Sequence, residues 1–333
     1  MIKKIKDSFY LKVIYSILII MLVMQSCIIL FPSTKPKIDS WQNYASFNFE
    51  QEEVISPNGE KIVYNLISTP EQLAGALMQQ GSGVYADSHG TYFTSSNNYK
   101  LANDINLSGK SWTPTTNSVT IDGNYRTIRN LTTSYSGQYV GFVSKNTGTI
   151  KNIFFESLSV TNTYTAGAAS GTGAVAGYNT GTIKNIVVTG GSVTGNSFGT
   201  YSGDNNRDRR TGGIVGYNVG GTIENCENNA NISSGKFSGG IVGNQSSGTI
   251  KACVNRGSVK CGQNVYPRLG GIVAEITGGT LTQCLNYGYI SNYYMGASTA
   301  VSDVRIGGIA GMSNVAITQC GNYSTVESDG HYD

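Results

Sequence analysis

Four cysteines recur in the second half of the chain, and an asparagine follows each of them two residues later. The thiols are Cys226, Cys253, Cys284 and Cys320, and the amides are Asn228, Asn255, Asn286 and Asn322. A zinc site is disfavoured because no Cys-x-x-Cys pair exists, His89 and His331 are the only histidines, and equivalent positions of a repeat would place ligands in a line. Parallel Cβ vectors on neighbouring strands also lie farther apart than a disulfide prefers. We therefore interpret the cysteines as small buried hydrophobic groups and the asparagines as a hydrogen-bonded ladder, with no metal and no cofactor. Cys261 falls outside this register and is interpreted as a loop thiol.

Tyrosine and arginine gather in the variable segments 195–211, 234–238, 260–269 and 292–305, which should emerge on one face. Aromatic rings and forked guanidinium groups suit a sugar or an extended acidic ligand. The candidate binding residues are Tyr201, Arg207, Arg209, Arg210, Tyr266, Arg268, Tyr293, Tyr294 and Arg305. The alternative is that these segments are solvated loops without a ligand.

A catalytic interpretation starts from Asp204 and Asp208 beside Arg207 and Arg210, since some parallel β-helices cleave acidic polysaccharides with carboxylates, calcium and a basic residue. These residues share one glycine-flanked loop, whereas such sites draw on several stacked strands. The strand positions expected to face outward provide no paired carboxylates for glycoside hydrolysis; they are Lys151, Lys184, Glu224, Lys251, Thr282 and Thr318. We predict no catalytic residue and keep a lyase-like, polysaccharide-degrading enzyme as the alternative.

The elements that must position these residues repeat. Glycine-flanked apolar segments recur at Gly212–Gly216, Gly239–Gly243, Gly270–Ala274 and Gly307–Gly311, with weaker copies at Val140–Ser144 and Gly173–Gly177. Each is followed by a second and a third short strand. A unit of this size cannot bury its own apolar face, so it must stack on its neighbours. The sequence predicts an all-β, right-handed parallel β-helix of about six repeat coils plus leading coils over residues 101–333.

The Gly-Ile-Val-Gly segments at Gly213–Gly216 and Gly240–Gly243 resemble GLUG-motif repeats, with isoleucine for the usual leucine. The upstream stretches Tyr99–Leu107, Trp112–Pro114 and Ile121–Leu131 resemble the coils that precede such repeats. The resemblance implies a right-handed β-helix of bacterial surface and secreted proteins, many of them adhesin-like and some joined to immunoglobulin-A-cleaving metallopeptidase domains. A peptidase role is not carried over, because a zincin helix needs two histidines one turn apart.

Residues 1–31 form a targeting segment, in which lysines precede the apolar run Val13–Phe31. Cleavage before Cys27 would leave a lipidated surface lipoprotein, which we favour over an uncleaved single-pass anchor. Either interpretation puts the remainder outside the cytoplasm. Four lysines and one aspartate in the first twelve residues account for the net charge of +3, so we predict no nucleic-acid partner.

Residues 32–63 are assigned to a linker and first strand, and residues 64–100 to a capping helix and leading segment. The helix should begin after the N-cap Thr69 and run from Pro70 to Gln80. Its apolar face should cover the open N-terminal end of the solenoid, a role favoured over membrane binding because the segment lacks lysine and arginine; that face comprises Leu73, Ala76, Leu77 and Met78. The other end has no such cap, so we expect either a truncated sequence or a last coil that meets a partner or another copy.

Together these features predict a surface-exposed, membrane-anchored, non-catalytic protein of the bacterial cell envelope. Its expected partners are the membrane, through the N-terminus, and a glycan or an extracellular host or matrix protein.

Overall fold

The chain divides into two compact units, Met1–Asp39 and Ser40–Asp333. The structure, a computed structural model, describes residues 39–78, 85–86, 92–93, 98–165, 169–196, 209–233, 236–261, 267–293 and 304–329. The predicted targeting segment 1–31, with Cys27, lies outside these residues. Among the described residues, no helix has the length and apolar character required to cross a membrane.

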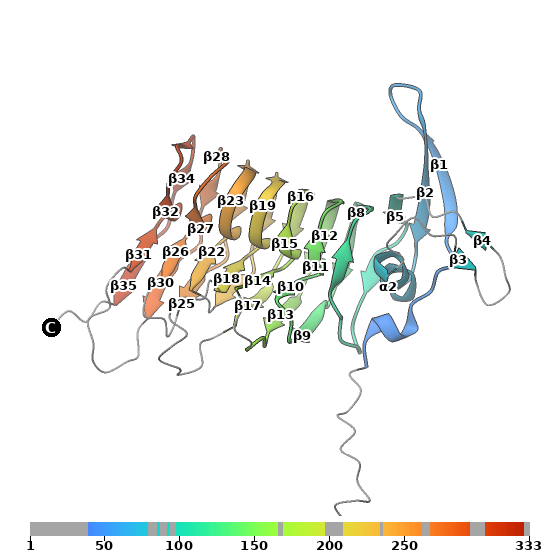
Figure 1. The fold of residues 1–333 in the computed structure, drawn as a ribbon, viewed down its shortest axis with the longest axis horizontal. Coiled ribbons are helices and arrows are strands. Elements are labelled where there is room, and N and C mark those ends of the chain that lie inside the picture. The colour runs from blue at the N-terminus through green and yellow to red at the C-terminus, as the bar shows by residue number, and fades with distance from the viewer. Residues whose placement is uncertain are drawn as a thin grey trace, which may run out of the picture. The chain divides into compact units, whose positions relative to one another are not determined.

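The unit that begins at Ser40 is a stack of short strands (Figure 1). Its described helices are the 3₁₀ helix η1 (Trp41–Tyr44) and α2 (Pro70–Met78). The largest sheet, named here the long sheet, contains β1 (Glu50–Ile55), β2 (Lys61–Ile67), β5 (Asn98–Leu101), β6 (Ile105–Asn106), β7 (Thr115–Asn117), β8 (Thr120–Arg129), β11 (Val143–Asn146), β12 (Thr149–Glu156), β15 (Ala176–Asn179), β16 (Thr182–Val188), β19 (Val215–Glu224), β20 (Glu227–Asn228), β23 (Val242–Lys251), β24 (Val254–Asn255), β27 (Val273–Ile276), β28 (Thr280–Thr282), β29 (Leu285–Asn286), β32 (Ala310–Ser313), β33 (Ile317–Thr318) and β34 (Gly321–Asn322).

Two further sheets complete the stack. The motif sheet contains β10 (Tyr139–Val140), β14 (Ser170–Gly173), β18 (Arg209–Gly212), β22 (Phe237–Gly239), β26 (Arg268–Gly270) and β31 (Arg305–Gly307). The third-strand sheet contains β9 (Thr132–Tyr135), β13 (Leu158–Asn162), β17 (Gly191–Thr194), β21 (Asn231–Ser233), β25 (Val259–Cys261), β30 (Ile290–Tyr293) and β35 (Val326–Asp329). A separate antiparallel pair is formed by β3 (Tyr85–Ala86) and β4 (Tyr92–Phe93).

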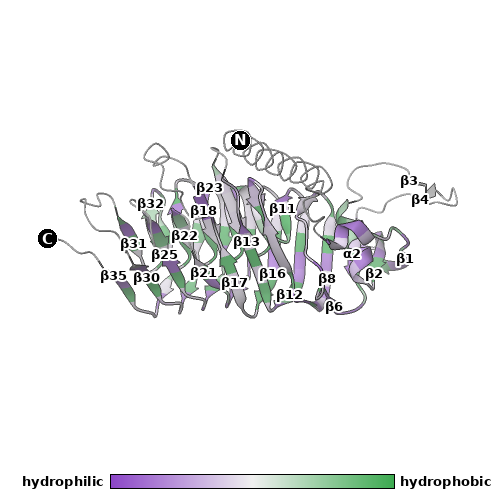
Figure 2. Ribbon diagram, turned by 90° about the horizontal axis from the view of Figure 1, so that it is seen from below, coloured by the Kyte–Doolittle hydropathy of each residue, from purple (hydrophilic) through white to green (hydrophobic). Residues whose placement is uncertain are grey.

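Strands of successive repeats pair in parallel at equivalent residues, which is how the repeat produces a solenoid. Ile183 pairs with Ile223, which pairs with Ile250, and all three side chains are fully buried. The flanking threonines and charged residues alternate with them, so hydrophobic and hydrophilic positions mix along the strands (Figure 2). The predicted all-β class and the stacking of parallel strands are confirmed.

The glycine-flanked segment was predicted to be a strand, and that prediction is wrong in detail. Gly213 and Ile214 form a sharp corner between β18 and β19. At this corner the motif sheet and the long sheet approach each other closely: a Cβ on Gly216 would lie 2.3 Å from the backbone nitrogen of Thr172. Only glycine lets the two backbones pack at this distance.

The predicted asparagine ladder is present. The Nδ2 groups of Asn228, Asn255 and Asn286 each donate to the Oδ1 of the next member, at 2.9, 2.8 and 2.7 Å, and the last acceptor is Asn322. A second buried ladder was not predicted. It runs through Asn117, Asn146, Asn179, Asn218 and Gln245, with 2.8 Å between successive amides. Both ladders satisfy polar groups at corners that would otherwise be buried without partners.

The five cysteines among the described residues are free thiols, and Cys226, Cys253 and Cys284 are buried, as predicted. The interpretation of Cys261 as a loop thiol is wrong, because Cys261 ends β25, is buried and pairs with Asn292. Burial raises the pKa of Cys253 well above its ordinary value, and the pKa of Cys284 is raised by its neighbour Cys253 and by burial. The thiols of Cys253 and Cys284 are therefore protonated, which fits their hydrophobic role.

The predicted helix begins at Pro70, where the Thr69 hydroxyl accepts a hydrogen bond from the Gln72 backbone N–H at 3.2 Å. Leu73, Ala76 and Leu77 are buried, whereas Met78 is 45% exposed, so the prediction for Met78 is wrong. The described helix ends at Met78, and residues 79–80 lie outside the described residues. Figure 1 shows α2 at the N-terminal end of the stack, where it contacts η1, β2 and β7.

A hairpin, missed by the sequence reasoning, protects the edge of the long sheet. The antiparallel strands β1 and β2 are joined by a turn with Gly59 at φ +85°, and β2 then pairs with β5 in parallel. The outer strand β1 carries glutamates, two of which pair with Lys61 at 2.6 Å and with Lys100 at 2.8 Å. A short, charged edge strand disfavours pairing with another chain.

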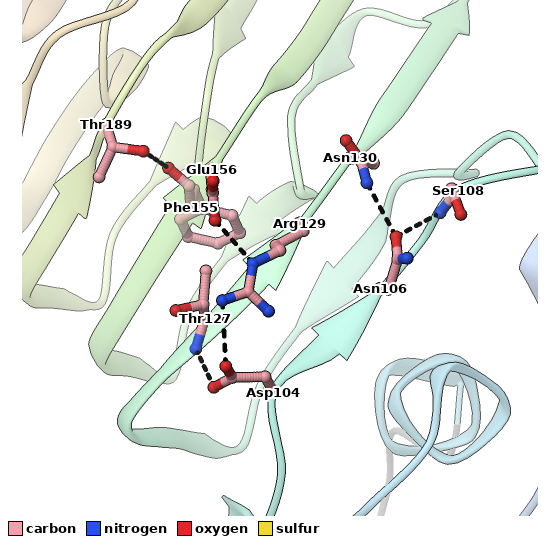
Figure 3. Close-up of polar contacts among 9 residues, drawn as sticks. All are labelled: Asp104, Asn106, Ser108, Thr127, Arg129, Asn130, Phe155, Glu156 and Thr189. Atoms are coloured by element: carbon pink, nitrogen blue, oxygen red, sulfur yellow. Dashed lines mark hydrogen bonds and ion pairs between the residues drawn. The ribbon is translucent and has the colours of Figure 1, made fainter.

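The leading coils are tied to the first repeats by an ion-pair cluster (Figure 3). Arg129 lies 2.7 Å from a carboxylate oxygen of Glu156 and 3.2 Å from one of Asp104. The Thr127 backbone N–H donates to Asp104 at 2.9 Å. That hydrogen bond, followed by the charge of Arg129, lowers the pKa of Asp104 below its ordinary value.

We expect Asp104→Asn to lower stability at neutral pH and to flatten the acid limb of the stability profile. Because the folded pKa of Asp104 lies below the unfolded one, its contribution is present above the unfolded value, about 4, and is lost as pH falls through the folded value. The free energy of unfolding in urea, measured at pH 7 and at pH 3 for wild type and for Asp104→Asn, tests this prediction. The control Glu53→Gln removes an exposed acid elsewhere, and equal pH slopes for wild type and Asp104→Asn would contradict the assignment.

Candidate ligand-binding face

All the variable segments connect the third-strand sheet to the motif sheet. The strands before them, such as β17, β21 and β25, stack in register, and so do the strands after them, such as β18, β22 and β26. The segments therefore start and end at one corner of the stack. Tyr201, Arg207, Tyr266 and Tyr294 lie outside the described residues. The backbone of Tyr293 pairs with Asp329, and its side chain is not among those described.

Beside this corner, side chains seven residues apart contact one another across three of the glycine corners. The guanidinium carbon of Arg210 lies 4.0 Å from the centroid of the Tyr217 ring. Arg268 pairs with Glu275, and Arg305 contacts the sulfur of Met312 at 2.6 Å. The close glycine packing brings the flanking residues of the two strands together, so the motif positions these pairs.

Tyrosines extend this arrangement along the stack. The rings of Tyr139 and Tyr178 are 5.0 Å apart, and those of Tyr178 and Tyr217 are 5.6 Å apart. The Lys145 ammonium lies 5.4 Å from the Tyr139 centroid and 6.0 Å from the Tyr178 centroid. We call Tyr139, Tyr178, Tyr217, Lys145 and Arg210 the tyrosine row.

The three rings of the row are only partly buried, and Lys145 is exposed, whereas Arg210 is almost fully buried against Tyr217. Burial raises the pKa of Tyr139, so its hydroxyl is protonated and can donate a hydrogen bond at neutral pH. The row thus combines aromatic surface, hydroxyl donors and cations, a set that suits sugars or acidic groups.

The other arginines predicted from the sequence have structural partners. Arg209 is buried and donates to the Tyr164 carbonyl at 3.1 Å, which joins β18 to the residues that follow β13. Arg268 lies between Glu275 and the Phe237 ring, whose centroid is 5.1 Å from its guanidinium carbon. Of the four described candidate arginines, Arg209, Arg210, Arg268 and Arg305, only Arg210 belongs to the tyrosine row.

Sequence reasoning missed Tyr139, Lys145, Tyr178 and Tyr217. The signal was the tripeptide Gly-Tyr-Asn at residues 177–179 and 216–218, where the asparagine belongs to the buried ladder and the tyrosine points the other way. The Cys-x-Asn segments, which predicted the first ladder, contain none of these four residues.

The outward column of the long sheet has the composition expected from the sequence. Lys151, Lys184, Glu224, Lys251, Thr282 and Thr318 pair in succession. Within it Lys251 pairs with Glu224 at 3.3 Å, and Lys151 pairs with Asp122 of β8 at 3.0 Å. Within the described parts of the chain, no group of three or more His, Cys, Asp or Glu side chains could hold a metal ion.

The fold and this face define a solenoid of parallel β-strands with glycine corners. Residues 209–233, which contain the corner between β18 and β19, match the family model of the GLUG motif, so the resemblance seen in the sequence is confirmed. No curated protein matches the chain.

A solved structure supports the fold. The chain is similar to the crystal structure of a protein from Bacteroides ovatus described as "a putative immunoglobulin A1 protease", with 20% sequence identity and a TM-score of 0.57. The match covers 80% of this chain and 77% of that one. At this identity the likeness supports the solenoid fold alone.

Proposed function

We propose that the chain is a surface-displayed, membrane-anchored and non-catalytic protein that binds a glycan or an extracellular protein. In this proposal the strands wind as a right-handed β-helix of six repeat coils behind the leading coils. The observation that carries the proposal is the tyrosine row, in which partly exposed rings from successive repeats lie beside cations. Such a row lies next to the corner where the variable segments begin and end.

The anchor is proposed from the sequence. The lysine-rich start and the apolar run Val13–Phe31 place the solenoid outside the cytoplasm of a bacterium, held by a lipid on Cys27 or by the uncleaved segment. The GLUG motif supports this, because the family resemblance implies surface proteins.

The non-catalytic role is proposed from the chemistry of the face. The tyrosine row offers no carboxylate, and the carboxylate of Glu275 nearby pairs with Arg268. Tyrosine side chains can bind a ligand by stacking and hydrogen bonding without cleaving any of its bonds. The word protease describes the Bacteroides ovatus protein, and we do not transfer it to this chain.

The test is a binding screen of the purified full chain against glycans and matrix proteins. For a ligand found this way, we expect Tyr178→Ala with Tyr217→Ala to weaken affinity at least tenfold, about 1.4 kcal/mol. The matched control is Tyr287→Ala with Tyr323→Ala, a stacked pair 5.1 Å apart elsewhere on the unit. Equal affinity for the two double variants would contradict the proposed face. Calcium-dependent release of unsaturated sugar ends from uronate polymers would contradict the non-catalytic role.

A further inference from the structure

Apolar side chains gather at the surface of the N-terminal end of the unit. Tyr44 is 48% exposed, Phe47 is 40% exposed and Met78 is 45% exposed. Phe47 packs over α2, since its Cδ1 lies 3.4 Å from the position a Cβ on Gly75 would take. Met78 follows Gly75 by three residues and so lies on the same side of the helix. Tyr44, Phe47 and Met78 are named here the terminal patch.

The patch is held on a fixed support. The Trp41 indole donates to the Leu107 carbonyl at 2.9 Å, and the Trp41 backbone N–H donates to the Ser111 carbonyl at 3.0 Å. The Ser46 N–H donates to the Glu71 carbonyl at 2.8 Å, which joins the segment after η1 to α2. The exposed rings are therefore presented by a braced surface.

A cation lies at the border of the patch. The Lys110 ammonium is 4.1 Å from the Tyr44 centroid and 5.7 Å from the Trp41 centroid. Tyrosine and tryptophan with a neighbouring lysine are the combination that populates the headgroup region of membranes. The sequence argued against a membrane-binding helix because residues 70–80 lack lysine and arginine, but here the cation comes from a different segment, between β6 and β7.

The distance along the chain to the apolar run is short. The run ends at Phe31, so eight residues separate it from Ser40. Eight extended residues span at most about 29 Å. A membrane that holds the run would keep the terminal patch close to its surface.

We propose that the terminal patch contacts the headgroup layer of the lipid bilayer that anchors the chain. This inference rests on the proposed anchoring and adds a second contact to it. Tyr44 and Phe47 insert at the headgroup level, Met78 adds apolar area, and Lys110 faces lipid phosphates. The opposite end of the unit, where Tyr323 is 67% exposed, points away from the lipid.

The experiment uses the full chain reconstituted into bilayers of phosphatidylcholine with phosphatidylglycerol, with or without brominated acyl chains. Tyr44→Trp adds one indole at the patch, and the matched control Tyr323→Trp adds one at the other end; Trp41 and Trp112 are common to both. We expect the added emission of Tyr44→Trp to be quenched at least twofold by brominated lipid, and that of Tyr323→Trp to be unchanged. Adding Phe47→Ser and Met78→Ser to Tyr44→Trp should reduce the quenching while the chain stays bound.

Two failures are distinguishable. If the chain binds the bilayers but the indole at position 44 is not quenched, the contact is overturned and the anchoring stands; cover of the patch by residues 79–97 would give this result. If the chain does not associate with lipid at all, the anchoring and the contact both fail.

Discussion

Gly216→Ala is expected to destabilise the unit by about 3 kcal/mol or more, and to prevent folding if the total stability is of that size. The new Cβ would lie 2.3 Å from the Thr172 backbone nitrogen and 2.7 Å from the Gly171 carbonyl carbon. These are backbone atoms of the neighbouring motif strand, so no side-chain rotation relieves the overlap. The two sheets would have to separate at this corner. Thermal or urea unfolding, followed by circular dichroism, measures the effect.

Gly190→Ala is the matched control, because a Cβ at Gly190 would meet nothing within 4 Å. We expect a change within about 0.5 kcal/mol. Similar losses at the two positions would mean that the glycines act through chain flexibility and not through close packing of the sheets.

Asn255→Leu is expected to cost about 2–5 kcal/mol. Its side chain is fully buried, donates to the Gly257 carbonyl at 2.9 Å and to Asn286 at 2.8 Å, and accepts from Asn228. Leucine has a similar size but leaves buried groups on both neighbours without these partners, each costing about 1–3 kcal/mol. The free energy of unfolding in urea is the measurement.

Asn322→Leu removes the last member of the same ladder. Asn322 is exposed and has one ladder neighbour, Asn286, which keeps its bond to the Gly288 carbonyl at 2.9 Å. We expect a loss of about 1 kcal/mol. An equal loss for the two asparagines would show that the ladder is not the source of the stability.

The sequence predicted the parts of the fold that depend on repetition. The spacing of Cys226, Cys253 and Cys284, with Asn two residues later, placed equivalent strands on top of one another, and their buried thiols and linked amides follow from that register. The helix start was also predictable, since Thr69, Pro70 and Gln72 form a local signal that needs no distant partner.

Features that depend on two segments meeting in space were not predicted. The corner at Gly213–Ile214 has the apolar composition of a strand, and only the approach of the neighbouring repeat shows why glycine flanks it. The contact of Tyr139 with Tyr178 joins residues from different repeats and different sheets. The hairpin turn Asn58–Gly59 was a local signal that the sequence reasoning overlooked.

Because successive repeats pair at equivalent residues, the chain consists of turns that could be removed or added as units. Gly239 pairs with Gly270 in the motif sheet. The next residue, Gly240, packs against the Gly271 carbonyl, just as Gly213 of the preceding repeat packs against the Gly240 carbonyl. An in-frame deletion of residues 240–270 would join Gly239 to Gly271 and bring Thr280 onto Thr222 and Asn286 onto Asn228, which preserves the strand pairing and the ladder through Asn228. The bond from Asn218 to Gln245 and the ion pair of Lys251 with Glu224 would be lost. Recombination between such segments would therefore shorten or lengthen the solenoid by whole turns, and under the proposed anchoring it would change how far the C-terminal end lies from the anchor.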